Sequence, residues 1–476
     1  MYKYLRALSL FLIISSPLIA IQRHVYESNG AQGIQDSINV SSTYDTVMVH
    51  KGIYYVRDID SLGITMKDSI ILFSPNPDSV TLNGLNSTGT DTAYHVIYCD
   101  FGNSDSSGAL IKGFKITGGN ASGDGHPNGF GGGICCLNSS PVIESCIITD
   151  NYAKSGGGIY SYCGSPIIVK NSIANNSCSQ CGGGMRLLYG TPIVVENSII
   201  NNYSNWLGGG IFSDYSASTI LRNTINHNSA HWDGGGVWLN AGNIILRDNI
   251  IINDSARDYG GGIYLERANV TIEENTIVNN HAKFGGGIYS CGFPKIKYNI
   301  IIDTTFCAIY IKTDSAFIDS NNIYATGYAV SNSDSFDIDA RYNYWGTVDT
   351  NTINAKIYDF YDNSTMGIVC YQPFLTDSLK FGIEEKKIEN IKTNLSIYPN
   401  PSFGNSIIKY GLPEKATVSL TLYDISGRLV QTMYSGTQKA GDHTININSY
   451  KIAKGIYFAK LNAGDFKATK KLILMR

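Results

Sequence analysis

Glycine and apolar positions recur along residues 131–288 with a period of 25 or 26 residues. Each period begins with three consecutive glycines followed by one apolar residue. The triplets begin at Gly131, Gly156, Gly182, Gly208, Gly234, Gly260 and Gly285. A fixed period of about 20–50 residues is the mark of a solenoid, in which each repeat packs against the next.

Polar positions keep the same period. One column reads Ser145, Asn171, Asn197, Asn223, Asn249 and Asn275, each followed two residues later by isoleucine, and a further asparagine closes most units. Short runs rich in Ile and Val, such as residues 192–196, indicate strands rather than helices. Three strands of about five residues plus three turns account for one period. We therefore predict a parallel β-helix with isoleucines inside, asparagines stacked in turns, and glycines at a crowded or positive-φ corner.

The Gly-Gly-Gly-Ile unit, followed by a strand and an Asn-Ser/Thr-Ile run, resembles the right-handed β-helix repeats of pectin-lyase-like and outer-membrane-type surface proteins. The resemblance implies an all-β fold, a right-handed parallel β-helix solenoid. It says little about function, because this fold carries lyases, hydrolases, adhesins and inert spacers. The catalytic motifs of pectate lyases and polygalacturonases are absent from the sequence, so the resemblance transfers no catalytic residue.

The two ends of the predicted β-helix differ from its repeats. Residues 1–20 have a basic start and a short apolar stretch, which is typical of a secretory signal peptide. Residues 21–375 form the β-helix domain. Its N-terminal cap includes a short amphipathic helix around residues 34–38, because an uncapped first coil would expose a sheet edge. Near the other end, the run Asn343-Tyr-Trp-Gly346 is expected to plug the core with aromatic area.

The last hundred residues break the repeat. Residues 376–393 are dense in charge and are interpreted as a linker. Residues 394–476 alternate six strand-like segments with turns, which predicts a small Ig-like β-sandwich. The runs Tyr398-Pro-Asn-Pro401, residues 423–430, residues 454–461 and the basic end resemble the C-terminal sorting domain of the type IX secretion system. This resemblance implies recognition by the type IX secretion machinery and an extracellular or cell-surface location, reached through the periplasm.

Charge limits the partners of the chain. The net charge is −3, but residues 394–476 contain 11 Lys and Arg against four Asp and Glu, so the β-helix is acidic. An acidic solenoid disfavours nucleic acid. No apolar run beyond the signal peptide is long enough to span a bilayer, so no transmembrane segment is expected in the mature protein.

The ten cysteines permit disulfides in an exported protein, and bridges between neighbouring coils are plausible between residues 135 and 181. Cys178 and Cys181 have the spacing of half a zinc site, but no second pair accompanies them. We therefore predict no metal site and no cofactor, with calcium left open.

One column of the repeat is expected to point outward, because it follows the inward apolar residue on the same strand. Five of its seven members are aromatic. These side chains, with others two residues further on and in the loop before the glycines, form a candidate glycan-binding face: Tyr160, Arg186, Trp206, Phe212, Asp214, Trp232, Trp238, Tyr264, Glu266 and Tyr289. Flat aromatics stack on sugar rings, whereas carboxylates and arginine bind hydroxyls. The alternative is a stacked aromatic ladder that stabilises the sheet and is partly covered by loops.

A catalytic version of this face is also considered. Asp214 and Glu266 are two coils apart, roughly 9–10 Å from the strand spacing, which is near the upper separation of the carboxylates in inverting glycosidases. Weaker acid or base candidates are His231, Asp233, Arg257 and Asp258. Solvated acidic residues explain these pairs equally well.

Three functions therefore remain open. The first is a secreted or cell-surface, non-catalytic solenoid that binds extracellular polysaccharide or acts like an adhesin. The second is a polysaccharide lyase or glycoside hydrolase. The third is a purely structural exoprotein.

Overall fold

The structure is a computed structural model that describes residues 20–102, 108–303, 305–313, 315–379 and, with short gaps, 396–474. The chain divides into two compact units, Met1–Leu379 and Lys380–Arg476. Residues 1–19 of the predicted signal peptide and residues 380–393 of the predicted linker lie outside the described residues.

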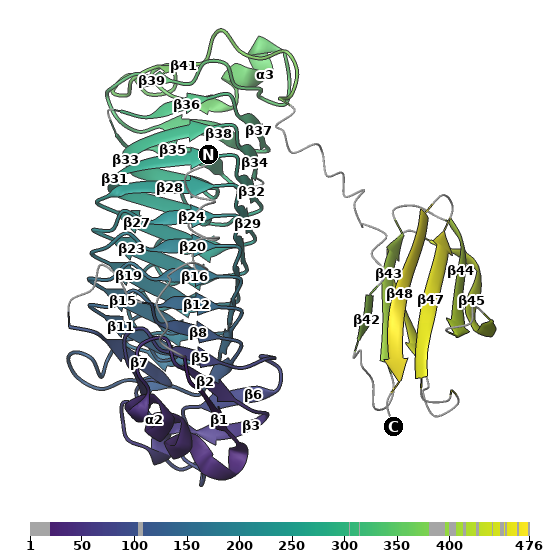
Figure 1. Ribbon diagram of the computed structural model, residues 1–476. Coiled ribbons are helices and arrows are strands. Elements are labelled where there is room, and N and C mark those ends of the chain that lie inside the picture. Colours follow the sequence, from purple (N-terminus) through teal and green to yellow (C-terminus); the bar gives the residue numbers. More distant parts are fainter. Residues whose placement is uncertain are drawn as a thin grey trace. The chain divides into compact units, whose positions relative to one another are not determined.

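The first unit is a parallel β-helix, shown as a stack of coils in Figure 1. Strands of successive coils pair in parallel and in register, so that residues one period apart are direct neighbours. Ile159 pairs with Met185, and Met185 pairs with Ile211. The prediction of a parallel β-helix from the repeat is confirmed.

The largest sheet has 24 strands and contains two rows. The row after the glycine triplets comprises β4 (Ile64–Met66), β7 (Ile97–Asp100), β11 (Ile134–Leu137), β15 (Ile159–Tyr162), β19 (Met185–Leu188), β23 (Ile211–Asp214), β27 (Val237–Asn240), β31 (Ile263–Glu273), β33 (Ile288–Lys297), β35 (Cys307–Ile311), β38 (Tyr328–Asn332) and β40 (Ile357–Tyr358). The next row comprises β1 (Gln22–Val25), β2 (Thr46–Val49), β5 (Ile71–Phe73), β8 (Leu110–Lys112), β12 (Val142–Glu144), β16 (Ile167–Val169), β20 (Ile193–Val195), β24 (Thr219–Leu221), β28 (Asn243–Arg247), the second halves of β31 and β33, β36 (Phe317–Asp319), β39 (Ile338–Asp339) and β41 (Val369–Cys370).

Two smaller sheets complete the coils. The 11-stranded sheet comprises β3 (Gly52–Tyr55), β6 (Val80–Asn83), β9 (Lys115–Thr117), β13 (Ile147–Thr149), β17 (Ser172–Ala174), β21 (Ser198–Ile200), β25 (Thr224–Asn226), β29 (Ile250–Ile252), β32 (Thr276–Val278), β34 (Ile300–Asp303) and β37 (Asn322–Ala325). The six-stranded sheet comprises β10 (Asn120–Ala121), β14 (Tyr152–Ala153), β18 (Ser177–Cys178), β22 (Tyr203–Ser204), β26 (Ser229–Ala230) and β30 (Ser255–Ala256). The estimate of three strands per coil is therefore wrong for the regular coils, which have a fourth, two-residue strand.

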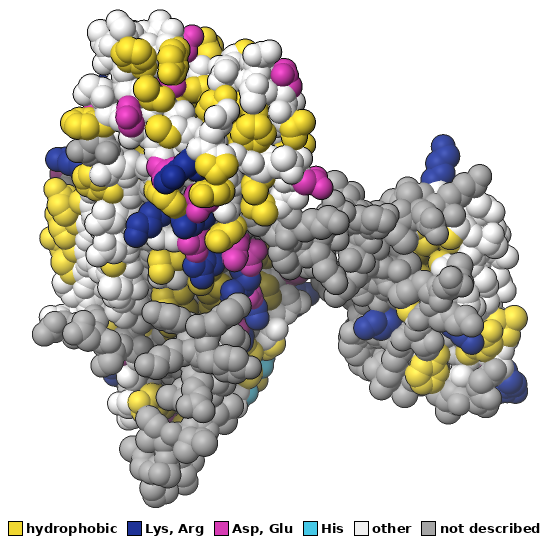
Figure 2. All heavy atoms as spheres, turned by 90° about the horizontal axis from the view of Figure 1, so that it is seen from above, with side chains coloured by type: hydrophobic (Ala, Val, Ile, Leu, Met, Phe, Trp, Pro, Cys, Tyr) yellow, Lys and Arg dark blue, Asp and Glu magenta, His cyan; other side chains and the backbone are white. Residues whose placement is uncertain are grey.

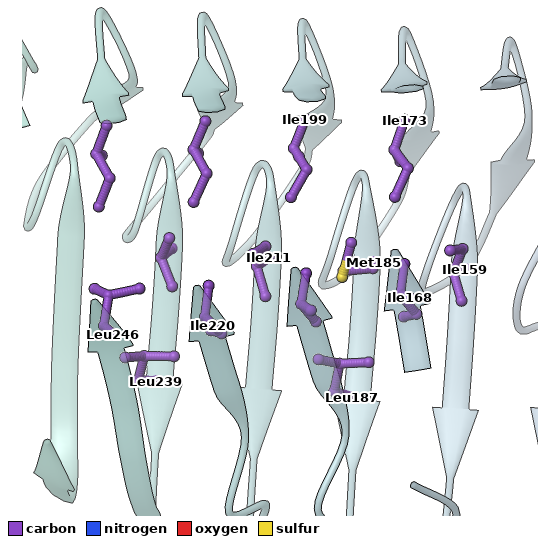
Figure 3. Packing of buried hydrophobic residues seen from close by; sticks show 14 of the residues in the cluster. Ile159, Ile168, Ile173, Met185, Leu187, Ile199, Ile211, Ile220, Leu239 and Leu246 are labelled. Atoms are coloured by element: carbon purple, nitrogen blue, oxygen red, sulfur yellow. The ribbon is translucent and has the colours of Figure 1, made fainter. Parts of the chain in front are cut away.

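Stacked apolar side chains fill the interior of the β-helix. In Figure 3, side chains such as Ile159, Ile168 and Ile173 point inward from three rows of strands. All three are fully buried. Burying one such side chain stabilises the fold by about 1.5–3 kcal/mol before the entropy of ordering is counted.

Asparagines form two buried ladders at the turns. Asn197 Nδ2 donates to Asn223 Oδ1 at 3.0 Å, and the Asn197 backbone N–H donates to the same oxygen at 2.9 Å. The residue before each asparagine has positive φ, as at Glu196 (φ 57°). The side-chain amide therefore replaces the backbone hydrogen bonds that the turn forgoes. The stacking predicted for this column is confirmed from Asn171 onward. At its first position the prediction of Ser145 is wrong, because Cys146 lies beside Asn171 and its backbone N–H donates to Asn171 Oδ1 at 2.8 Å.

Both ends of the β-helix have distinct elements. At the N-terminal end, α2 (Gly30–Val40) packs on the first coils beside η1 (Glu27–Asn29) and η2 (Val56–Asp58) and buries Ile34 and Ile38. At the other end, Trp345 is fully buried in the core, near α3 (Thr350–Asn354). The indole of Trp345 fills the end of the core, as expected.

Charged side chains form ion pairs along the outer surface of the β-helix. Glu196 pairs with Arg222 at 3.0 Å, and Lys297 pairs with Asp319 at 3.4 Å. Figure 2 shows basic and acidic side chains interspersed on the face in view.

The second unit is antiparallel. Its three-stranded sheet comprises β42 (Ser396–Tyr398), β43 (Ser406–Leu412) and β46 (Gly441–Ile447), and its four-stranded sheet comprises β44 (Ala416–Asp424), β45 (Leu429–Gln438), β47 (Gly455–Ala463) and β48 (Phe466–Leu474). One apolar cluster, including Ile408, Leu420 and Leu472, forms its core. Within the described residues, no helix is long and apolar enough to cross a membrane.

Candidate functional site

The predicted outward column lies on the outer face of the strands that follow the glycine triplets. Its side chains form an apolar cluster separate from the interior core, with Cys135, Tyr160, Phe212 and Trp238 among its members. Strand pairing places Phe212 beside Trp238 and Trp238 beside Tyr264. The direction expected from strand alternation is therefore observed.

The rings of this column stack along the β-helix. Phe212 and Trp238 are 4.3 Å apart between ring centroids and inclined by 3°, and Trp238 and Tyr264 are 5.9 Å apart at 3°. Tyr264 and Tyr289 continue the stack at 5.2 Å. The Arg186 guanidinium carbon lies 5.2 Å from the Phe212 ring centroid. Offset stacking of this kind adds about 0.5–1.5 kcal/mol per pair beyond the burial of area.

Most of this stack is covered. Tyr160, Phe212, Trp238 and Tyr289 have exposed fractions of only 1%, 3%, 4% and 4%. Their inclusion in an exposed glycan-binding face is therefore corrected: their ring faces contact protein. The arrangement is the covered aromatic ladder that was weighed as the alternative.

The cover comes from the residue before each glycine triplet. The first glycine of a triplet has positive φ, as at Gly156 (φ 66°), and a Cβ there would lie 2.6 Å from the Ile159 carbonyl oxygen. This turn folds the preceding residue back over the ladder. The Tyr259 ring, for example, lies 4.6 Å from the Tyr289 ring, and the Phe130 ring lies 4.8 Å from the Tyr160 ring.

Trp206 and Trp232 lie outside this cover. They occupy equivalent positions in successive coils and are 50% and 41% exposed. The Trp232 backbone N–H donates to the Trp206 carbonyl oxygen at 3.0 Å, so the two residues are direct neighbours in adjacent coils. The Arg257 guanidinium carbon lies 4.7 Å from the Trp232 ring centroid, and the His231 ring contacts the edge of that indole at 5.2 Å. We call Trp206, His231, Trp232 and Arg257 the tryptophan ridge.

Arg186 and Asp214 are half-buried beside the ladder. Arg186 Nη1 donates to Ser155 Oγ at 2.8 Å, whereas Arg186 Nε is buried without a hydrogen-bond partner. Burial raises the pKa of Asp214, and this effect is opposed by Asn240 Nδ2, which donates to Asp214 Oδ1 at 2.8 Å. Both side chains are thus engaged with protein groups of their own face.

The other carboxylates fall into two kinds. Glu266 pairs with Arg267 at 3.2 Å, and Asp258 pairs with Arg257 at 3.8 Å. Asp233 has no ion pair among the described residues and accepts a hydrogen bond from the Tyr259 backbone N–H at 3.1 Å. Burial raises the pKa of Asp233 to about 6, with a further rise from the nearby negative charges of Asp258 and Glu266. Asp214 and Glu266 stand in one column with Asn240 between them.

No group of three or more His, Cys, Asp or Glu side chains in the described part of the chain is arranged to hold a metal ion. All ten cysteines are free thiols, so the expected bridges between coils are not formed in this structure. Cys99 and Cys136, in the core, are direct neighbours on β7 and β11.

One exposed aromatic pair was not predicted from the sequence. Tyr189 and Tyr215 stack at 5.5 Å and 19° beyond the ends of β19 and β23, and both are exposed. Their φ angles are 52° and 47°, a conformation uncommon for tyrosine. The two tyrosines are one period apart in the sequence, but they lie in turns, where strand alternation does not predict which way a side chain points.

Comparison with known families matches most of the chain. Residues 79–256, 155–292 and 204–372 match the right handed beta helix region, and residues 396–475 match the secretion system C-terminal sorting domain. Such a sorting domain directs export by the type IX secretion machinery to the cell surface or the extracellular space.

Comparison with individual proteins adds less. No curated protein sequence matches the chain. One similar solved structure is the enzymatically active domain of tailspike protein 4 of bacteriophage CBA120, with 12% identity and a TM-score of 0.35. The alignment covers 93% of this chain and 65% of the tailspike chain. At this identity and TM-score, the likeness supports no conclusion about activity or ligand.

Proposed function

Because this chain belongs to the right-handed β-helix family and carries a secretion sorting domain, we propose that it is an exported protein that binds extracellular glycans, without cleaving them, through the tryptophan ridge. The route to the surface runs through the periplasm, where the predicted signal peptide would deliver the chain. The sorting domain then acts as the export address, and the β-helix acts as the binding module.

The observation that carries this proposal is the exposure of Trp206 and Trp232 in successive coils. Two exposed indoles on neighbouring coils form a larger apolar patch than a single exposed side chain, and covering that patch with the apolar face of a ligand is favourable. Parallel coils place equivalent backbone positions roughly 4.8 Å apart, so one saccharide chain can contact both indoles. Arg257 and His231 supply hydrogen-bond donors for hydroxyl groups beside that surface.

Replacement of Trp232 or Trp206 by alanine is therefore expected to weaken retention of the full chain on its glycan by about tenfold or more, which corresponds to about 1.4 kcal/mol. A polysaccharide array measures retention. It is run with and without calcium, because the sequence leaves open whether calcium takes part in binding. Tyr361→Ala is the matched control, since Tyr361 is an exposed aromatic residue at the C-terminal end of the β-helix. Equal retention by Trp232→Ala, Trp206→Ala and the control would reject the ridge as the binding surface.

Glycoside hydrolysis is a second candidate function, favoured by Asp233. A carboxyl group with a pKa of about 6, as in Asp233, can donate a proton near neutral pH, and a second carboxyl group such as that of Glu266 would act as the base. If the chain hydrolyses a glycan, Asp233→Asn should abolish product release while retention persists.

Reducing ends released between pH 4 and pH 8 measure this activity, and glycan arrays measure retention in parallel. Wild-type protein that releases no products from any polysaccharide would exclude the hydrolase. Absence of both retention and products would leave the purely structural exoprotein as the function.

A further inference from the structure

Two histidines meet on the outer face of the first coil. β1 pairs in parallel with β2, and His24 stands directly beside Met48 in that pairing. The alternation of the strands buries Val25 and Val49 and turns His24 and Met48 outward. His50 follows β2 immediately, so its ring reaches the same outer face.

The two imidazoles face each other at close range. His24 Nδ1 lies 2.8 Å from His50 Nε2, and the ring centroids are 5.1 Å apart. Tyr26 stacks against the His50 ring at 4.3 Å and 5°, which restricts the orientation of this imidazole. Neither histidine is in an ion pair among the described residues, and the two facing nitrogens share one hydrogen bond with each other.

A soft third ligand lies beside this pair. Gln22 Nε2 donates to the Met48 sulfur at 3.3 Å, which shows that this thioether lies on the outer face rather than in the core. Met48 is the direct strand neighbour of His24, so the two side chains leave the same outer face side by side. The ligand set is two imidazole nitrogens and one thioether sulfur, with the remaining positions left to water.

We propose that His24, His50 and Met48 form a copper-binding site at the N-terminal end of the β-helix. Two nitrogens at right angles on a metal with bonds of about 2.0 Å stand about 2.8 Å apart, which is the separation found here. Tetragonal nitrogen sites suit copper(II), imidazole and thioether ligands suit copper, and copper(II) binds most tightly among the divalent first-row ions. Loading the site requires that the shared proton leaves to solvent and that the two rings turn slightly, so that both lone pairs point to the metal beside the line between the nitrogens.

Copper(II) titration of the metal-free full chain, followed by calorimetry and electron paramagnetic resonance, tests this site. We expect one tight equivalent whose spectrum shows hyperfine coupling to nitrogen. Loss of a neighbour that only orients a ligand weakens metal binding by about 10–100-fold, so His24→Ala and His50→Ala should each weaken copper(II) binding by at least about tenfold. Met48→Leu should weaken copper(I), measured against a chromogenic chelator, more than copper(II).

His227→Ala and His281→Ala are the matched controls, because both histidines are exposed and lie in other coils. They should leave the tight equivalent unchanged. Copper(II) binding that is lost equally in the control variants, or that persists in the His24→Ala/His50→Ala double variant, would overturn the proposal. A wild-type spectrum without nitrogen coupling would overturn it independently of any variant.

Discussion

Replacing Trp238 with alanine is expected to lower the free energy of unfolding of the β-helix by about 3–5 kcal/mol. The Trp238 indole is buried on the outer face and is stacked between Phe212, at 4.3 Å, and Tyr264, at 5.9 Å. Its removal leaves a cavity between two rings whose positions are fixed by their own strands. Neighbouring coils cannot close this gap, because each is hydrogen-bonded in register above and below.

Denaturant unfolding followed by circular dichroism measures this loss, and hydrogen exchange locates it in the coils of β23, β27 and β31. Trp232→Ala is the matched control, since Trp232 is a half-exposed indole only six residues away in the sequence. It should cost less than about 1 kcal/mol. Equal losses in the two variants would contradict a structural role for the covered ladder and reopen Trp238 as a ligand contact.

Replacing Asp254 with asparagine is expected to raise the free energy of unfolding at pH 7 by about 1–3 kcal/mol. Asp254 is fully buried and occupies a position in the ladder that the adjacent coils fill with Asn228 and Asn280. Its Oδ1 accepts from the Asn228 backbone N–H at 2.7 Å and from Asn228 Nδ2 at 2.9 Å. Its Oδ2 has no hydrogen-bond partner, although the amide at this place in the next coil, Asn280 Nδ2, donates to the Ile251 carbonyl oxygen at 3.0 Å.

The stabilisation by Asp254→Asn should depend on pH. Burial raises the pKa of Asp254 well above its usual range, so the folded chain holds this carboxyl protonated. The contribution of Asp254 to the free energy of unfolding is at its full value below the pKa of this carboxyl in the unfolded chain, about 3.9. It is lost as the pH rises through the higher pKa of the same carboxyl in the folded chain. The difference between wild type and Asp254→Asn should therefore be small at pH 4 and grow towards pH 8.

Denaturant unfolding at several pH values measures this difference. Asn202→Asp is the matched control, because it places the same acid two coils away in the same ladder and should destabilise the fold with the same pH dependence. An unchanged difference between pH 4 and pH 8, or a less stable Asp254→Asn variant at pH 7, would contradict a protonated carboxyl in the ladder.

The sequence by itself determined the architecture. A parallel in-register stack places each residue beside the residue one period away, so the spacing of the glycine triplets and of Asn171, Asn197 and Asn223 specified the strand register and the asparagine ladder. Alternation along a strand also showed that Phe212 and Trp238 point away from the core. These features depend only on neighbouring residues or on the repeat period, so they can be predicted from a single sequence.

Only the tertiary structure decided which outward side chains remain accessible. The positive φ of the first glycine in each triplet folds the preceding residue over the ladder, so Trp238 is buried while Trp232, two positions before that triplet, is exposed. The contact between His24 and His50 could not be predicted from the sequence either, because these residues lie in the irregular first coils, outside the periodic glycine columns. Periodicity specifies which residues are neighbours, but burial depends on how the chain folds back over its own surface.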